Sequence, residues 1–514
     1  MRATVGKREL CIAALVSAVL TGALLFDVLF LDRCTRAFTS DDPRIDLRPW
    51  AREPSAPLEP INMISPDVDG FILPGLMRAR QLEHAGAPPW WDHAQLCGIP
   101  LAANIPFPLL YPVGVALHSA APMAAIDWML ALHLALAAWL AYRACRMLGT
   151  EPAAAAVGAI GFALSAAMMV RWRGAHEVYA IAWWPAQLVA LEWLRRDRWR
   201  RALVEGALAT ALMLLAGFPQ TAVVLTAGTC MLAIGDRSLW RLRVLVALFA
   251  MLGLGAMMAW PQLRISGAAY GLSIRASAAT RSATAQRGLA AAALIAGVLP
   301  DFFGNPAAFS VAPNAATMEA WLPHRRFLGD EIQNSVYYNA FYPGMLLVLL
   351  LPALLRTARA RRFGVCLVLA LSACLVSPLV MPHVPGMSWL ATGNIKRLLT
   401  LVDACWPIGA ALALHAAWQR GVSVPWRATG ALVLTARRAA RARRAHRRSR
   451  GGRVRRGAGA AGDAADPVRA CRTRRARARA PAPRALPPGA GAVARSRPAR
   501  APTTRWRASR STTP

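Results

Sequence analysis

Long apolar runs recur along this chain and constrain its fold more than any other feature of the sequence. The first covers residues 10–31 and is 22 residues long. A helix of about 20 apolar residues spans a hydrocarbon core about 30 Å thick. Further runs, most of them 17 to 22 residues long, cover roughly 123–142, 153–170, 178–194, 202–219, 221–235, 244–263, 339–356, 363–381 and 398–419. We therefore predict an all-α, polytopic integral membrane protein with about ten transmembrane helices.

Composition and missing motifs argue against several classes of function. Of the 514 residues, 56% are hydrophobic, and the mean hydropathy is +0.35. Soluble domains contain roughly 45–50% apolar residues, so a soluble enzyme is not expected. The nine cysteines include no Cys-x-x-Cys pair, and there is no Walker A, Gly-x-Ser-x-Gly or His-Glu-x-x-His motif. Zinc-finger, ATPase, hydrolase and zincin functions therefore lack support.

Basic residues are divided unevenly between the loops that alternate across the predicted membrane. If the N-terminus is inside, the inside segments hold 19 Lys and Arg residues, and the short outside turns hold four. Short cytoplasmic loops carry an excess of such residues. We therefore predict a cytoplasmic N-terminus and two long outer loops, at about 32–122 and 264–338. The first of these loops holds ten of the 26 acidic residues, and the second carries six arginines.

The last 79 residues differ in composition from everything before them. Residues 436–514 contain 24 arginines, no lysine and two acidic residues, so they carry 22 of the 34 net positive charges. Such a composition cannot build an apolar core. We therefore divide the chain into a polytopic transmembrane domain, 1–435, and a tail, 436–514. The tail is either a disordered basic arm or, as we favour, a shifted reading frame of GC-rich DNA, and nucleic acid is not expected as a partner.

Ionisable residues in or beside predicted spans are costly in a membrane, and each is a functional candidate. Asp403 lies in the last predicted span, shortly after the basic pair Lys396 and Arg397. His176 and Glu177 lie at an outer turn, where the imidazole could donate to a phosphate or act as an acid or base. The alternative for each is structural: an interfacial carboxylate near a loop arginine, or a polar turn. From the residues alone, the structural alternative is favoured.

Two carboxylates in the acidic outer loop form an Asp-x-Asp sequence, Asp67 and Asp69. Such a pair can coordinate a divalent cation through oxygen ligands, and either member can act as a general base toward an acceptor hydroxyl. The alternative is that both residues are ordinary solvated charges. Because the loop holds ten acidic residues, this alternative is favoured when the pair is considered alone.

Several segments, read together, resemble the YfhO-like family of bacterial membrane proteins. The most specific are Gly-Ala-Pro-Pro-Trp-Trp-Asp at 86–92, Gly-Ile-Pro-Leu-Ala-Ala-Asn at 98–104 and Leu-Tyr-Pro at 110–112. The resemblance covers about 60–430, with two departures: Asp92 stands where the family commonly has Asn, and Phe218 stands where its turn often has His. Further agreement in the same order lies at 131–134, 176, 184–185, 216–220, 261, 273–275 and 339–344.

The resemblance implies a function, because this family is similar to glycosyltransferases of the GT-C type. Those enzymes use a lipid-linked sugar as donor and place an acidic residue in the first outer loop. Carried over to this chain, that residue would be Asp67 or Asp69, which reverses the preference for solvated charges. The implied partners are a polyprenyl phosphate sugar and an acceptor that is an envelope polymer or a glycolipid. The implied location is the bacterial inner membrane, with transfer on its outer face.

A polyprenyl phosphate donor also needs cations for its phosphate, and arginine can bind phosphate with two parallel hydrogen bonds. The candidates on the outer side are Arg264, Arg275, Arg325, Arg326, Lys396 and Arg397. Two alternatives stay open: a transporter or flippase of lipid-linked envelope intermediates, and an inactive, truncated relative of the enzymes.

Overall fold

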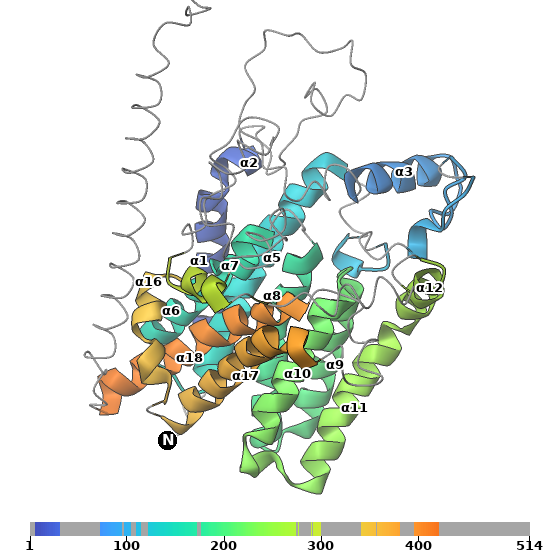
Figure 1. Cartoon of the computed structure of the whole chain (residues 1–514). Helices are drawn as coiled ribbons and strands as arrows, with labels where there is room; N and C mark the ends of the chain where they lie inside the picture. Colours follow the sequence, from blue (N-terminus) through green and yellow to red (C-terminus); the bar gives the residue numbers. More distant parts are fainter. Residues whose placement is uncertain are drawn as a thin grey trace, which may run out of the picture. The chain divides into compact units, whose positions relative to one another are not determined.

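The computed structural model describes residues 6–30, 72–94, 97–103, 109–114, 122–171, 176–273, 276, 289, 291–299, 341–355, 357–380 and 395–420. The chain divides into two units, Met1–Arg444 and Ala445–Pro514, and the second lies wholly outside these ranges. The predicted tail, 436–514, therefore also lies outside the described residues. Regular structure in the described part is helical, apart from one isolated bridge between Asp92 and Ile99 (Figure 1).

The helices follow one another in this order. The first are α1 (Lys7–Leu24), α2 (Phe26–Phe30), α3 (Leu73–His84), the 3-10 helix η2 (Leu101–Ala103), α5 (Pro122–Met147), α6 (Pro152–Ala163), α7 (Ala166–Met169), α8 (His176–Arg195) and α9 (Trp199–Leu215). The later ones are α10 (Pro219–Ile234), η4 (Arg237–Leu239), α11 (Leu242–Met258), α12 (Trp260–Gly271), η6 (Ala291–Gly297), α16 (Met345–Leu349), η9 (Leu351–Leu355), α17 (Ala358–Val380), η11 (Ile395–Leu398) and α18 (Leu399–Arg420).

The all-helical prediction is confirmed, and the described helices include several that could cross a membrane. Four stretches are long and apolar enough: Ile126–Met147, Pro152–Met169, Ala358–Ser377 and Ile395–Gln419. A fifth is added if α11 and α12 form one bent span. These helices indicate a bilayer environment, because about 20 apolar residues match its thickness. The total of ten spans stays a prediction.

Several expected spans differ from the sequence prediction. The first, 10–31, is divided between α1 and α2, with Leu25 between them. The span at 244–263 is broken, because α11 ends at Met258 and α12 continues at an angle of 67°. Pro261 lies in the first turn of α12, where its missing N–H is tolerated. In one straight helix, its ring would clash with the carbonyl group of the preceding turn. The described part of 339–356 contains only the short α16 and η9, with Gly344 at φ +107° before α16 and Pro352 within η9.

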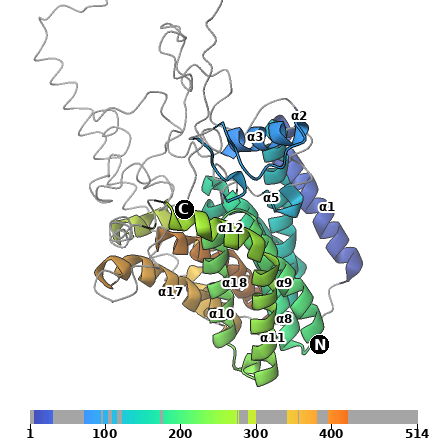
Figure 2. The same ribbon diagram turned by 90° about the vertical axis from the view of Figure 1, so that its right-hand side faces the viewer.

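Helix α8 forms the centre of the bundle, packed against α5, α9 and α10. Its Gln187 amide donates to Thr210 on α9 at 2.9 Å and to Thr226 on α10 at 3.0 Å, and it accepts from Thr229 at 2.9 Å. Hydrogen bonds of this kind join helices where no water competes. Along the outside of the bundle, α1 packs against α5 (Figure 2).

Small residues bring α6 and α18 close together. A Cβ atom on Gly158 would lie 2.7 Å from the Cβ of Ala411 and 3.4 Å from the carbonyl oxygen of Pro407. A glycine at 158 therefore permits an approach that a side chain would prevent, as is common between membrane helices.

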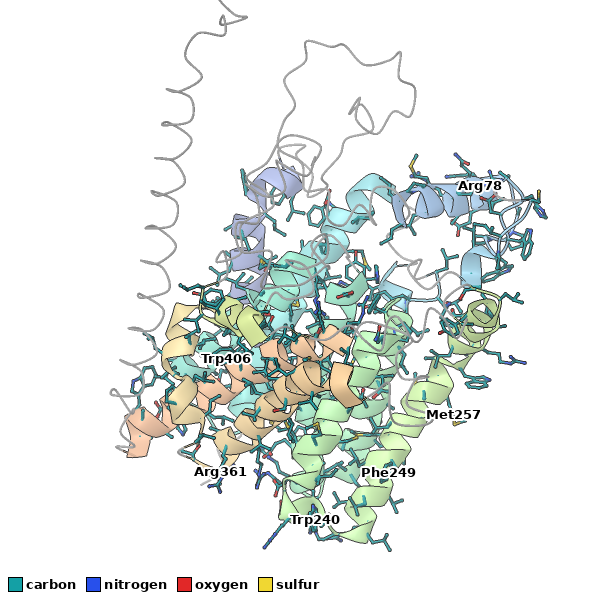
Figure 3. All side chains as sticks on the ribbon, viewed as in Figure 1. Arg78, Trp240, Phe249, Met257, Arg361 and Trp406 are labelled. Carbon is teal, nitrogen blue, oxygen red and sulfur yellow. The ribbon has the colours of Figure 1, made fainter. Side chains whose placement is uncertain are left out.

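Large apolar side chains on α11 and the turn before it face away from the bundle. Trp240, Phe249 and Met257 are 57%, 67% and 71% exposed and project outward (Figure 3). Exposed apolar residues repeated along one helix suit contact with lipid chains.

Long-range contacts sort the helix ends into two groups. At one end, which we call the basic end, Arg146 pairs with Glu9, Arg196 donates to the carbonyl oxygen of Met147, and Arg362 pairs with Asp236. At the other, which we call the first-loop end, Gln262 donates to the carbonyl oxygen of Ala102 at 2.8 Å, and Arg397 pairs with Glu177. Successive helices therefore alternate between these two ends.

Candidate functional site

The segment with the Pro-Trp-Trp sequence folds back on itself beside α3. The backbones of Asp92 and Ile99 exchange two hydrogen bonds, both of 2.8 Å. Gly98 has φ +121°, and a Cβ atom there would lie 2.6 Å from Nε1 of Trp91. Only glycine fits this position, both for its backbone conformation and for the space beside the indole.

Asp92 fastens this fold to α3. Its Oδ1 accepts from Nε of Arg78 at 2.7 Å and from the N–H of Ala94 at 2.9 Å. Desolvation acts to raise the pKa of Asp92, but the hydrogen bonds from Ala94 and Arg78 outweigh it, and the pKa lies below its usual value. The carboxylate at this position, where the resembled family commonly has Asn, therefore gains an ion pair that an amide would lack.

The Leu-Tyr-Pro segment is anchored in the bundle through Tyr111. Nδ1 of His133 lies 2.6 Å from the carbonyl oxygen of Met129 and donates to it, which leaves Nε2 to accept from the Tyr111 hydroxyl at 2.6 Å. Nε1 of Trp183 donates to the same hydroxyl at 2.7 Å. Tyr111 thereby joins the first loop to α5 and α8.

Deeper at the first-loop end, one carboxylate holds two arginines. Glu177, in the first turn of α8, has Oε2 3.1 Å from Nη1 of Arg171, and its Oε1 accepts from Nη1 of Arg397 in η11. Nη1 of Arg171 also donates to the hydroxyl of Thr400 on α18. We call Arg171, Glu177, Arg397 and Thr400 the arginine cluster. Its members come from two separate parts of the chain, 171–177 and 397–400.

Burial makes the arginine cluster unusual. Arg171 is 1% exposed and Glu177 is 2% exposed. Nε and Nη2 of Arg171, which form one edge of the guanidinium, have no hydrogen-bond partner among the described residues. A buried hydrogen-bond donor that is left unpaired costs about 1–3 kcal/mol of free energy, and more when it belongs to a charged group. This edge is therefore a place where an acceptor from outside the described chain would be stabilised.

An aromatic ring closes one side of the cluster. Phe218, at the turn before α10, lies with its ring centroid 4.0 Å from Cζ of Arg397 and 4.9 Å from the imidazole centroid of His176. A guanidinium over an aromatic face gains a cation–π attraction, which is larger where water is excluded.

Asp403 lies one turn beyond Thr400 on α18 and bonds to the backbone of α7. Its Oδ2 accepts from the N–H of Ala167 in α7 at 2.6 Å, and the residue is fully buried. This bond ties α18 to the helix that ends at the arginine cluster. It gives Asp403 a role in positioning that helix.

The structure brings some predicted site residues together and leaves others apart. His176, Glu177 and Arg397 meet in or beside the arginine cluster. Lys396 is 2% exposed in η11, and Arg264 is exposed on α12. Five predicted residues lie outside the described part of the chain: Asp67, Asp69, Arg275, Arg325 and Arg326.

Sequence reasoning missed Arg171 and Thr400 as site residues. Arg171 entered only the count of loop charges, although an arginine that ends an apolar run six residues before a glutamate was an available signal. Thr400 carried no signal, because a threonine in an apolar helix is ordinary.

Within the described residues, no group of three or more His, Cys, Asp or Glu side chains is placed to hold a metal ion. The predicted Asp67 and Asp69 metal pair lies outside these residues.

Comparisons of the chain with models of known protein families, with curated proteins and with solved structures find no match. The YfhO-like resemblance therefore continues to depend on the segments quoted from the sequence.

Proposed function

We propose that this protein is a membrane glycosyltransferase that takes a sugar from a polyprenyl phosphate donor and transfers it to a cell-envelope acceptor. The observation that carries the proposal is the unpaired guanidinium edge of Arg171 in the arginine cluster. It is supported by helices suited to a bilayer, in which the polyprenyl chain would be soluble.

The arginine cluster suits a phosphate group. Nε–H and Nη2–H of Arg171 point in parallel from one edge, and two oxygens of a phosphate can accept both. Arg397 adds a second positive charge, whereas Glu177 supplies one negative charge between the two. The pair of arginines therefore keeps an excess of positive charge for the donor phosphate. In this proposal Glu177 is a positioning residue, because it aligns both guanidinium groups.

The transfer step needs a base as well as a phosphate site. The acceptor hydroxyl oxygen forms a bond to C1 of the sugar, and the bond from C1 to the phosphate oxygen breaks. Polyprenyl phosphate leaves with the electron pair, and the hydroxyl proton passes to a carboxylate. Following the family resemblance, we assign this carboxylate to Asp69 or Asp67, which would also be the ligands if a divalent cation takes part. In this proposal the reaction occurs at the outer face of a bacterial inner membrane.

Binding of undecaprenyl phosphate tests the phosphate site without knowledge of the sugar. Arg171→Lys keeps the charge and loses the two-donor edge, so we expect its affinity to fall about tenfold, the loss of one charge-assisted hydrogen bond of roughly 1.5 kcal/mol. Arg143→Lys is the matched control, because Arg143 makes a two-pronged pair with Glu205 elsewhere in the bundle. Native mass spectrometry of the full chain gives both affinities. Equal affinities for the wild type and Arg171→Lys would contradict the proposed phosphate site.

Transfer itself is tested by supplying radiolabelled undecaprenyl phosphate sugars to membranes that contain the full chain. Asp69→Asn or Asp67→Asn should lower incorporation into lipid or polymer by about 10²–10⁴, the usual contribution of a general base. The amount of protein in the membrane should stay the same. Wild-type rates in both single variants and in the double variant would show that the base lies elsewhere.

A transporter or flippase of lipid-linked intermediates is the second candidate. The observation that favours it is the 67° break between α11 and α12, because broken helices build many transporter sites. Reconstituted vesicles distinguish the two functions. Movement of fluorescent undecaprenyl phosphate between leaflets, with no incorporation of sugar into any acceptor, would replace the enzyme proposal with this one.

A further inference from the structure

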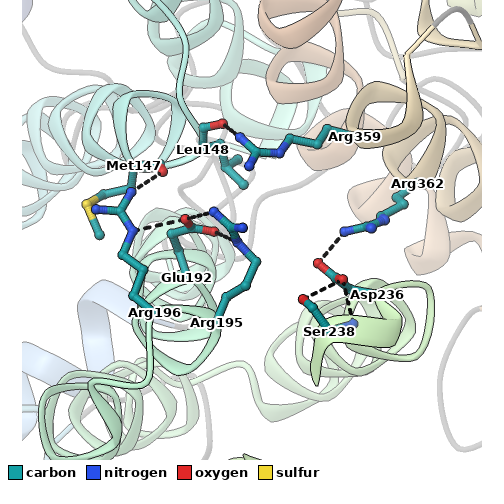
Figure 4. A network of polar contacts seen from close by, with 9 residues as sticks. All are labelled: Met147, Leu148, Glu192, Arg195, Arg196, Asp236, Ser238, Arg359 and Arg362. Carbon is teal, nitrogen blue, oxygen red and sulfur yellow. Dashed lines mark hydrogen bonds and ion pairs between the residues drawn. The ribbon is translucent and has the colours of Figure 1, made fainter. Parts of the chain in front are cut away.

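A second group of arginines lies at the basic end of the bundle, and Figure 4 shows its polar contacts. Three of these arginines line a small pocket. We call it the basic-end pocket and define it by Glu192, Arg195, Asp236, Arg359 and Arg362, which line it. The pocket lies between the last turn of α8, the turn after α10 and the first turn of α17. Its volume is about 50 Å³, room for several water-sized groups.

Ion pairs leave this pocket with an excess of positive charge. Glu192 accepts from both Arg195 and Arg196, and Asp236 accepts from Arg362 and from the hydroxyl of Ser238. Three arginines therefore share two carboxylates, and a fourth, Arg359, lines the same pocket. An additional anion would be attracted here, since each arginine is always charged.

Arg359 is the arginine that has no carboxylate partner among the described residues. Its Nη1 donates to the carbonyl oxygen of Leu148, at the turn between α5 and α6. Arg195 and Arg362 both lie close enough to repel it electrostatically, and Glu192 and Asp236, which already pair with other arginines, attract it. Its remaining N–H groups are exposed at the pocket and are available for an anion that would relieve this repulsion.

The surroundings of the pocket are those of a membrane surface. The candidate span in α17 begins at Ala358, directly before Arg359. Trp240 and Leu242, just beyond the Asp236 turn, are 57% and 78% exposed. Tryptophan is enriched at the level of lipid headgroups, and an exposed leucine suits the acyl region beside it. The pocket floor is apolar, with side chains such as Leu188, Leu232 and Phe363.

From this combination we propose that the basic-end pocket binds the phosphate of an anionic phospholipid headgroup, with Arg359 as its principal donor. Basic pockets between membrane helices commonly bind such headgroups. The site is separate from the arginine cluster, since α8 places Glu177 in its first turn and Glu192 in its last. Occupation would join α17 to the α5–α6 turn and to the end of α8.

Protection of wild-type arginines from phenylglyoxal tests the proposal in the unaltered full chain. The protein in detergent is modified with and without dioctanoyl phosphatidylglycerol, and the modified peptides are measured by mass spectrometry. We expect protection of Arg359 and none of Arg361, which is exposed on the same helix and does not line the pocket. Equal protection of both, or of neither, would overturn the proposal.

Variants and competing probes identify the ligand. Arg359→Gln should weaken binding of dioctanoyl phosphatidylglycerol by about five- to tenfold, the effect of one arginine at a headgroup, and Arg361→Gln should leave it within about twofold. Inorganic phosphate and dioctanoyl phosphatidylcholine, at the same concentration and ionic strength, should protect Arg359 less. Protection by inorganic phosphate equal to that by phosphatidylglycerol would overturn the lipid source and assign the site to a soluble phosphate compound.

Discussion

The guanidinium of Arg397 lies over the ring of Phe218, with Cζ 4.0 Å from the ring centroid, while Nη1 donates to Glu177. One side of the cation thus meets an apolar aromatic face, and an edge meets a carboxylate. The aromatic ring does not compete for the hydrogen bonds of the guanidinium. Phe218 therefore restrains Arg397 without reducing its capacity to hold an anion.

Phe218→Leu should destabilise the first-loop end. The cation–π attraction lost is worth about 0.5–2 kcal/mol, and the contact with His176 is lost as well. Thermal unfolding of the detergent-solubilised protein measures the effect as a lower midpoint. Phe249→Leu on α11, where the ring is 67% exposed, is the matched control and should shift the midpoint less. Equal shifts would show that the stacking contributes nothing.

Gly98→Ala should open the fold of the Pro-Trp-Trp segment. A residue forced into φ +121° costs on the order of 1–3 kcal/mol, and the new methyl group would collide with Trp91. Hydrogen exchange of the Asp92 and Ile99 amides, which are bonded to each other's carbonyl groups, should become faster. Gly253→Ala on α11, where nothing lies within 4 Å of an added Cβ, should leave this exchange unchanged. Unchanged exchange in Gly98→Ala would contradict the assigned role of Gly98.

Asp92→Asn should destabilise the protein in a way that depends on pH. The pKa of Asp92 is lowered in the folded state, so its charge stabilises the fold above the unfolded pKa of about 3.9, and this contribution is lost as the pH falls through the folded value. The stability difference between the wild type and Asp92→Asn should have its full size near pH 6 and should shrink as the pH falls below about 4. Unfolding midpoints over this range measure it. A difference that persists unchanged into acid would show that the Arg78 pair is not its source.

Topology is open to a direct labelling test. With the N-terminus inside, a cysteine introduced at Ser55 should react with a membrane-impermeant maleimide in intact cells, and one introduced at Arg198 should react after permeabilisation only. Cys11 and Cys97 are exposed and would react as well, so the native cysteines are first replaced by serine. Arg198 labelling in intact cells together with protection of Ser55 would reverse the predicted orientation.

Part of the candidate site was accessible to sequence reasoning. His176, Glu177 and Arg397 were singled out because charged groups beside apolar runs are costly, and the structure places all three in or beside the arginine cluster. Arg171 and Thr400 were not singled out, because their importance lies in what they contact. An arginine that ends a helix and a threonine within one have many ordinary roles.

The sequence by itself determined the helical class and the membrane character, because runs of about 20 apolar residues have few other stable conformations in a bilayer. Tertiary structure decided which polar groups meet. Glu177 and Arg397 are 220 residues apart, and their ion pair depends on how the bundle brings the start of α8 to η11, which no local pattern specifies. The break between α11 and α12 depends on both the sequence and the tertiary structure. Pro261 permits a bend, but packing sets its angle of 67°.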